Sequence, residues 1–308
     1  MESLEQCRIE CGSIDLPATE AQRARWASVA ARLATWRHLL AGVDVWDIHS
    51  HVGCDIDGSR LSATQLVEAL DASGIARTVI FPMNDPRQGF CFEHPNDMIF
   101  ASYQLYSDRL LPFFRLNPNF PSLEEYDLRV RQGFRGIKLH PRSQSFRIAS
   151  PEAMRIYGWA ERDGLPVLVH TGAGAQSVVA DVRRVIDHHP QLRLILGHSA
   201  AQELPSCCAT CAHCDWVLFD TSTLDREQLR ELLRSTEPRK IAYGSDTPFH
   251  GEGEDLAQLL EVVEEVGLSQ ESLELILGGN LRRWLDGATP PRGTCALQSG
   301  ETPTSPSH

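Results

Sequence analysis

Short, continuously apolar runs alternate with amphipathic segments along most of this 308-residue chain. Apolar runs without a polar alternation predict strands that are buried on both faces, as in a parallel sheet covered by helices. The predicted strands are 43–53, Thr78–Met83, Leu110–Leu116, Phe134–His140, Pro166–His170, Leu192–His198, Trp216–Asp220 and Ile241–Ser245.

Helical periodicity fills nearly every gap between these strands. Eight strand-helix units over roughly 240 residues predict a (β/α)8 TIM barrel. An open doubly wound sheet is the alternative, but it would typically carry a glycine-rich phosphate loop after the first strand, and none follows residue 53. The predicted helices are Leu61–Ser73, Asp97–Tyr106, Leu123–Gln132, Pro151–Asp163, Val179–His188, Arg226–Ser235 and Asp255–Val266.

The two ends of the chain differ from this pattern. Residues 1–42 form an N-terminal helical extension, in which an amphipathic helix over Glu20–Leu40 carries Trp26 and Trp36. These tryptophans are expected to cover the main domain, 43–285, or to form a subunit contact in a homodimer. Residues 286–308 are rich in Pro, Gly, Ser and Thr and are expected to be a disordered tail, since they cannot bury enough apolar surface.

The composition of the chain argues against two classes of partner, nucleic acids and membranes. The net charge of −12 argues against nucleic acid or an anionic membrane surface. No apolar run approaches the roughly 18–20 residues of a membrane span. We therefore expect a soluble, cytoplasmic protein that acts on a small molecule.

Titratable side chains gather at predicted strand ends. The first strand ends in HSH, and the two-residue period of a strand places His49, His51 and Asp47 on one face. Because the active site of a TIM barrel lies at the carboxyl ends of its strands, side chains there should converge. Nitrogen and oxygen ligands from several strands are what an open catalytic zinc site needs. The other strand-end candidates are Lys138, His140, His170, His198 and Asp246.

A cysteine-rich segment offers a second candidate metal site. Cys207, Cys208, Cys211 and Cys214 lie within eight residues, beside His213. Thiolates at this spacing can bind zinc or an iron–sulfur cluster. The segment also falls where a helix is expected, and there the same spacing places small apolar side chains on one buried stripe. We favour packing and keep a structural metal as the alternative.

The motifs DIHSH, GIKLHP, VHTG, GHS and GSD, followed by GGNLRRWL, resemble the amidohydrolase superfamily. More narrowly, they are similar to its amidohydrolase-related (amidohydrolase 2) branch, which includes decarboxylases of the aminocarboxymuconate-semialdehyde type. The resemblance implies one divalent metal ion, with zinc favoured and manganese or iron as alternatives. The implied ligands are His49, His51, His170 and Asp246. His198 would orient or deprotonate the water, and Asp246 would also shuttle a proton.

Three further residues keep alternative roles. In binuclear relatives a lysine at the position of Lys138 is carboxylated and bridges two metals, but this lysine could instead hold a substrate carboxylate. His140 could line the pocket or belong to a turn. Arg115, at the end of the third strand, would suit a carboxylate, although a structural ion pair is equally compatible.

These features predict a metal-dependent hydrolase that cleaves an amide C–N bond or a lactone or ester C–O bond of a small molecule. The first alternative is a metal-dependent non-oxidative decarboxylase. An alternative of another class is a non-catalytic metal-binding protein built on the 207–214 cysteine cluster.

Overall fold

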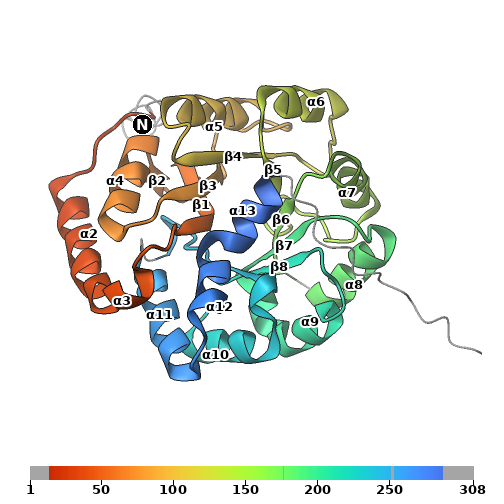
Figure 1. The fold of residues 1–308 in the computed structure, drawn as a ribbon. Helices are drawn as coiled ribbons and strands as arrows, with labels where there is room; N and C mark the ends of the chain where they lie inside the picture. Colours follow the sequence, from red (N-terminus) through yellow and green to blue (C-terminus); the bar gives the residue numbers. More distant parts are fainter. Residues whose placement is uncertain (1–13, 176, 251–252, 287–308) are drawn as a thin grey trace, which may run out of the picture.

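The computed structural model describes residues 14–175, 177–250 and 253–286, so the predicted tail lies outside the described residues beyond Asp286. Its strands form one curved sheet ringed by helices (Figure 1). The strands are β1 (Trp46–Cys54), β2 (Arg60–Leu61), β3 (Arg77–Pro82), β4 (Leu110–Arg115), β5 (Gly136–Leu139), β6 (Val167–His170), β7 (Leu194–Gly197), β8 (Val217–Asp220) and β9 (Ile241–Ala242).

The strand order confirms the predicted TIM barrel. Neighbours run β2-β1-β3-β4-β5-β6-β7-β8-β9, and every pair is parallel except β1 with β2. The segment after β9 closes the ring against β1, because the backbone N–H of Ile48 donates to Tyr243 O at 2.9 Å and that of Asp246 to His49 O at 2.8 Å. The last predicted strand therefore continues as irregular backbone beyond Ala242.

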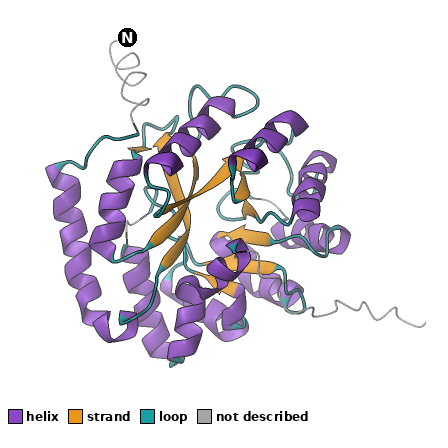
Figure 2. Cartoon of the chain, turned by 45° about the horizontal axis from the view of Figure 1, so that its top comes forward, coloured by secondary structure: helices purple, strands orange, loops and turns teal. Residues whose placement is uncertain are grey.

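Helices surround the sheet, as its apolar strands require (Figure 2). Local signals fix their ends. Ser62 caps α4 (Ala63–Ser73), which stops at Gly74, and Ser150 caps α7 (Pro151–Asp163), which stops at Gly164; both glycines are in the left-handed conformation. The helices are α2 (Glu20–Leu33), α3 (Arg37–Leu40), α4 (Ala63–Ser73), α5 (Glu93–Leu105), α6 (Leu123–Gln132), α7 (Pro151–Asp163), α8 (Val178–His188), α9 (Leu204–Cys211), α10 (Arg226–Ser235), α11 (Glu254–Val266), α12 (Gln270–Glu274) and α13 (Asn280–Leu285).

Two apolar layers hold this arrangement. The larger lies between the sheet and the surrounding helices. The smaller fills the barrel interior, where Trp46 and Ile48 join Leu281 and Trp284 of α13. Arg193, just before β7, donates to Trp284 O at 2.7 Å, so α13 covers the amino-terminal ends of the strands. The opposite, carboxyl-terminal end is left for the polar residues. Across the described residues, every helix is too short or too polar to span a bilayer.

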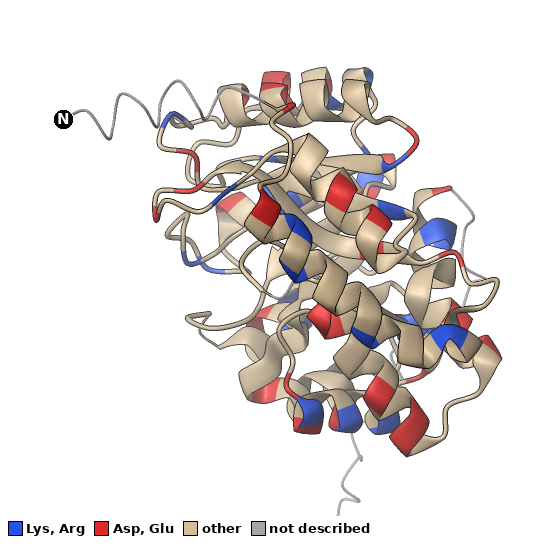
Figure 3. Cartoon of the chain, turned by 90° about the vertical axis from the view of Figure 1, so that its left-hand side faces the viewer, with Lys and Arg blue, Asp and Glu red and all other residues tan. Residues whose placement is uncertain are grey.

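The N-terminal helix covers the side of the barrel beside α4 and α11 (Figure 1). It is not continuous over Glu20–Leu40 as predicted, because a 3-10 turn over Ala34–Trp36 separates α2 from α3. Acidic and basic residues are interspersed along the elements on this side of the molecule (Figure 3). Among them, Arg32 pairs with Glu261 of α11 at 2.7 Å. Trp26 and Trp36 are both buried, as expected for side chains that cover the main domain.

Trp26 is expected to be the main apolar anchor of α2. Its side chain is 1% exposed and packs with Ala18 and Ala69. Trp26→Ala should therefore lower the free energy of unfolding by about 3–5 kcal/mol, the usual cost of emptying a buried tryptophan site. Urea denaturation would measure it. Arg25→Ala, on the exposed face of the same helix, is the control and should change stability by less than about 0.5 kcal/mol.

Candidate active site

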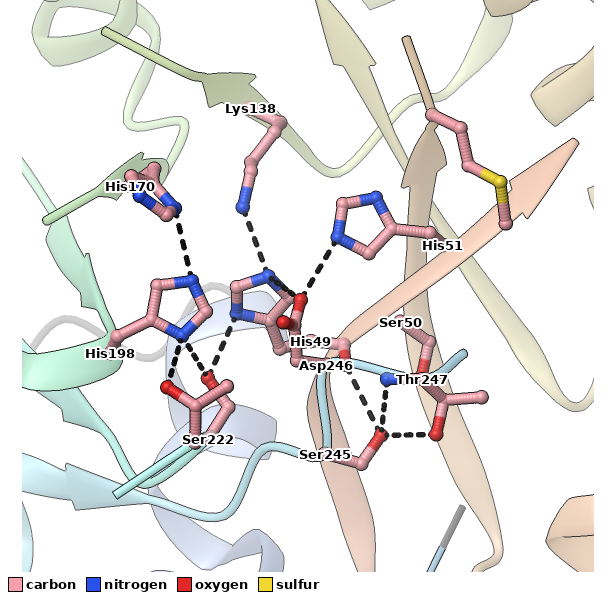
Figure 4. Close-up of polar contacts among 12 residues, drawn as sticks. His49, Ser50, His51, Lys138, His170, His198, Ser222, Ser245, Asp246 and Thr247 are labelled. Atoms are coloured by element: carbon pink, nitrogen blue, oxygen red, sulfur yellow. Dashed lines mark hydrogen bonds and ion pairs between the residues drawn. The ribbon is translucent and has the colours of Figure 1, made fainter. Parts of the chain in front are cut away.

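The sequence-predicted site residues line one cavity of about 520 Å³ at the carboxyl-terminal end of the barrel. They come from segments almost 200 residues apart, which the parallel strands bring to the same edge. Figure 4 shows most of them in contact. The residues that line the cavity are His49, His51, Arg115, Lys138, His140, His170, His198 and Asp246. Their individual roles stay predictions.

A bulge in β1 aims its two histidines. The pairing with β3 shifts between Asp47 and Ser50, which interrupts the two-residue alternation. Ile48 belongs to the barrel interior, while His49 and His51 line the cavity. The expectation that Asp47 shares the face of the two histidines is wrong, since the extra residue of the bulge turns its carboxylate elsewhere.

Asp47 instead braces the loop that carries Asp246. Its carboxylate accepts hydrogen bonds from Ser245 Oγ at 2.6 Å, Ser245 N at 3.1 Å and Ser50 Oγ at 2.9 Å. Burial raises the pKa of Asp47 to about 6, although these donors favour its charged form. Asp246, which follows Ser245 in this loop, has a left-handed backbone with φ of 58°. Aspartate is one of the few residues other than glycine that adopt this conformation, and the hydrogen bonds from Ser245 to Asp47 hold the loop in it.

Three predicted metal ligands converge at the floor of the cavity. Asp246 Oδ1 lies 3.0 Å from His49 Nε2 and 3.2 Å from His51 Nε2. These three donor atoms all lie within 4.8 Å of one another. Two imidazole nitrogens and one carboxylate oxygen are a ligand set that suits zinc and other divalent transition metals.

The geometry around His49 calls for a positive charge at this point. His49 Nδ1 lies 2.6 Å from Asp220 Oδ2 and must donate its proton there, since a carboxylate only accepts. In neutral His49 the Nε2 lone pair then faces the anionic Asp246 oxygen at 3.0 Å. Two acceptors at that distance repel unless a proton or another cation lies between them. A divalent metal fits this requirement.

Burial keeps most of the surrounding imidazoles neutral, which is the form that binds metals. It lowers the pKa of His51 to about 3, that of His198 to about 4 and that of His170 to about 2. Burial and Lys138 also lower the pKa of His49, but Asp220 and Asp246 outweigh them and raise it.

Asp246 is held as a carboxylate. Burial raises its pKa, but the positive charge that His49 carries when it is protonated, together with a hydrogen bond from His51, outweighs that effect and brings the pKa well below its usual range. An ionised Asp246 is ready to bind a cation.

Lys138 reaches the same point from β5. Its Nζ lies 3.0 Å from His49 Nε2 and 4.3 Å from the centre of the Phe81 ring. The side chain is buried, and burial lowers its pKa to about 7. Lys138 thus borders the three converging ligands and remains available either to a second metal or to a substrate carboxylate.

Replacing this lysine distinguishes the two roles. With one metal per chain, Lys138→Met should retain the wild-type metal content and fold, because methionine fills a similar volume without a charge to bury. Elemental analysis of both dialysed proteins measures the content. Two ions in the wild type and fewer in the variant would contradict this prediction and make Lys138 a bridging ligand.

His170 lies in the cavity but outside the converging group. Its Nδ1 is 3.0 Å from His198 Nε2, and its Nε2 is 3.3 Å from Ala173 O. The His140 ring stacks on it with a centroid separation of 4.0 Å. The metal-ligand role predicted for His170 therefore has less support from this geometry than the roles of His49, His51 and Asp246.

Arg115 combines structural hydrogen bonds with an unpartnered Nε. Its Nη1 donates to Met83 O and Asn84 Oδ1, both at 3.1 Å, and Nη2 donates to Ser143 Oγ at 3.2 Å. Nε is buried without a hydrogen-bond partner among the described residues. Burial lowers the pKa of this guanidinium to about 9, so it stays charged at neutral pH. Arg115 can therefore hold an anionic group in the cavity.

Other residues at this end of the barrel escaped the sequence analysis. Asp55 lines the cavity from the loop after β1. Asp220 and Ser222 lie behind His49 and His198. Asp220 could have been found, because it ends the seventh strand of the barrel just as the other candidates end theirs. Ser222 carries no comparable sequence signal.

The cysteine cluster packs as a helix face. Cys207, Cys208 and Cys211 are buried on α9, and Cys214 follows it. Thr236 Oγ1 donates to Cys208 Sγ at 3.3 Å. Within the described part of the chain, the two groups of side chains with converging metal donors contain no cysteine. This agrees with the packing interpretation of the cluster.

Comparisons with known proteins agree with the fold. A family model described as Amidohydrolase matches residues 46–287. No curated protein matches the chain. A 2,6-dihydroxybenzoate decarboxylase from Rhizobium superposes with a TM-score of 0.62 at 15% identity, covering 79% of this chain and 99% of its own.

Two further solved structures are similar. A 5-carboxyvanillate decarboxylase from Sphingomonas paucimobilis gives a TM-score of 0.59 at 12% identity, covering 80% of this chain and 99% of its own. A probable 2-pyrone-4,6-dicarboxylic acid hydrolase from Acinetobacter baumannii gives a TM-score of 0.59 at 13% identity, covering 79% of this chain and 99% of its own. At these identities the likeness shows a shared fold.

Proposed function

Since this chain belongs to the amidohydrolase family, we propose that it is a metal-dependent hydrolase that cleaves an amide C–N bond or a lactone or ester C–O bond of a small molecule. The observation that carries the proposal is the convergence of His49 Nε2, His51 Nε2 and Asp246 Oδ1 in a cavity large enough for a small organic substrate. The alternative of a non-catalytic protein built on the cysteine cluster is set aside, because the family consists of enzymes.

Each side chain has a defined part in this chemistry. His49, His51 and Asp246 would hold the metal, with zinc proposed first and His170 as a further candidate. When bound, such an ion polarises a carbonyl oxygen or lowers the pKa of a water molecule toward ~7. Asp246 is ionised and can accept a proton from the attacking water. His198 is neutral and can accept a hydrogen bond from the attacking water, which orients that water toward the carbonyl.

Basic side chains that line the cavity would orient the substrate. Arg115, Lys138 and Arg142 all line this space. A carboxylate on the substrate would pair with one of them, and a charged hydrogen bond of this kind is strong and directional.

A decarboxylase is the second candidate, and the same cations favour it. A carboxylate held by Arg115 or Lys138 could itself be the group that leaves as carbon dioxide. Structural neighbours carry both types of name, one a probable hydrolase and two decarboxylases. In that reaction the carbon that loses carbon dioxide must take up a proton, which His198 or Asp246 would first accept from water and then deliver.

Isotope incorporation distinguishes the two reactions. Metal-loaded protein would be incubated with small amides, lactones and carboxylated aromatics in H₂¹⁸O, and in parallel in ²H₂O. Hydrolysis places one ¹⁸O in the product acid, whereas decarboxylation releases carbon dioxide and places one ²H on carbon. Mass spectrometry reads both. Carbon dioxide release with ²H on carbon and no ¹⁸O in the product would overturn the hydrolase proposal.

A further inference from the structure

Asp220 is a buried carboxylate behind the two histidines on which the proposed chemistry depends. It ends β8, is 0% exposed and does not line the cavity. Its Oδ2 lies 2.6 Å from His49 Nδ1, 2.6 Å from Ser222 Oγ and 3.1 Å from His198 N. Its Oδ1 accepts from Ser222 N at 2.9 Å. Four donors thus surround one anion.

The proton of Ser222 can be placed by counting donors. A hydroxyl has one proton, and a carboxylate can only accept, so Ser222 Oγ donates to Asp220 at 2.6 Å. Ser222 Oγ also lies 2.9 Å from His198 Nδ1. Because the hydroxyl proton is already used, Ser222 must accept there. His198 therefore carries its proton on Nδ1.

His49 also carries its proton on Nδ1, because this atom donates directly to Asp220 Oδ2. In both neutral rings the lone pair is then on Nε2. His49 Nε2 points at Asp246 and Lys138, while His198 Nε2 points at His170 Nδ1 at 3.0 Å (Figure 4). Both lone pairs face the cavity rather than the barrel wall. The one proton of neutral His170 is then on Nδ1, and its longer Nε2 contact with Ala173 O, at 3.3 Å, has no proton.

We propose that Asp220 and Ser222 are positioning residues that fix His49 and His198 as Nδ1–H tautomers, so that both Nε2 atoms face the cavity. The inference deepens the proposed function and rests on it where it concerns the metal. A carboxylate behind a metal-binding imidazole orients the ring and makes its other nitrogen more basic. Here one carboxylate serves two rings, the first directly and the second through a hydroxyl.

Asp220 itself is not a ligand in this proposal. Donor atoms of His49, His198 and Asp220 lie within 4.8 Å of one another, as a metal site would require. However, protons from His49 and Ser222 already occupy the short contacts of Asp220 Oδ2. The Asp220 side chain is also fully buried and does not line the cavity.

The test uses Asp220→Asn, the double variant Ser222→Ala with Thr223→Val, and Ser199→Ala as control. The double variant removes both hydroxyls near His198 Nδ1, since Thr223 Oγ1 lies 3.1 Å away. Ser199 Oγ bonds to the backbone oxygen of Asp220 and to neither ring, so its loss controls for a missing buried hydroxyl. Zinc affinity would be measured by chelator competition. Tautomers would be read from long-range ¹⁵N–¹H spectra of metal-free protein, with signals assigned by loss in His49→Gln and His198→Gln.

Asp220→Asn should weaken zinc binding by about 10–100-fold and shift the tautomers of both rings. The double variant should retain nearly full zinc affinity but lose the Nδ1–H form of His198. Ser199→Ala should change neither. Wild-type zinc affinity and tautomers in Asp220→Asn would overturn the proposal. So would loss of one of two bound ions, which would make Asp220 a ligand.

These readouts keep this inference separate from the proposed function. If the wild type binds no metal, the proposed function fails, whereas the tautomers of metal-free protein still decide the role of Asp220. If Asp220→Asn does not fold, the double variant decides: an unchanged Nδ1–H signal of His198 would overturn the assignment to Ser222.

Discussion

Replacing His49 and His51 together with alanine is expected to abolish metal binding and to reduce activity by about 10³-fold or more. These rings supply two of the three donors that converge on the cavity floor. Asp246 alone cannot hold a transition metal tightly, and without the metal the transition state loses its main electrostatic stabilisation. Elemental analysis after mild dialysis measures the metal, and turnover of the substrate found in the isotope screen measures the activity.

A matched control exists on the surface. The double variant His94→Ala with His213→Ala removes two exposed histidines that do not line the cavity, and it should retain full metal content. Metal that survived in His49→Ala, His51→Ala would contradict the proposed centre. If that metal were then lost on replacement of Cys208 and Cys211, the cysteine cluster would be the true site.

Asp246→Asn should lower kcat/KM by about 10²–10⁴-fold while the fold is retained, because the change removes both a charged ligand and a proton acceptor. Asparagine is well suited to this position. It has nearly the shape of aspartate and tolerates the left-handed backbone that Asp246 adopts, with φ of 58°. Loss of activity can therefore be attributed to chemistry. Steady-state kinetics at saturating metal, with thermal melting alongside, measures both effects.

The control for this charge change is Asp187→Asn. Asp187 lies on the surface of α8, where it pairs with Arg183. Its replacement should leave kcat/KM unchanged, as expected for an exposed ion pair far from the cavity. Should Asp246→Asn match this control in activity, Asp246 would be neither the proton acceptor nor an essential ligand.

Much of the fold followed from local patterns. The seven predicted runs after β1 correspond to β3–β9 within a few residues, because continuous apolar runs can satisfy burial on both faces only inside such a barrel. The site residues were found by one rule, that polar groups at the carboxyl ends of parallel strands meet. The same rule would also have found Asp220, which ends β8.

Other features depended on contacts that no local pattern encodes. The break in the N-terminal helix at Ala34–Trp36 occurs where that segment packs against α11, and Trp36 Nε1 donates to Glu264 there at 3.0 Å. The bulge in β1 arises where this strand meets both β3 and the segment after β9. Periodicity describes one segment in isolation and therefore could not predict either irregularity.

The sequence by itself determined which residue types reach the end of the barrel: histidines, a lysine and carboxylates at strand ends. Only the tertiary structure decided which atoms face one another. His49 Nδ1 meets Asp220 across 171 residues of chain, and Asp246 approaches His51 across 195. A ring nitrogen becomes a proton donor or a lone pair according to its partner, and that partner is set by packing between distant strands. The orientation of the proposed metal ligands is therefore a property of the closed barrel.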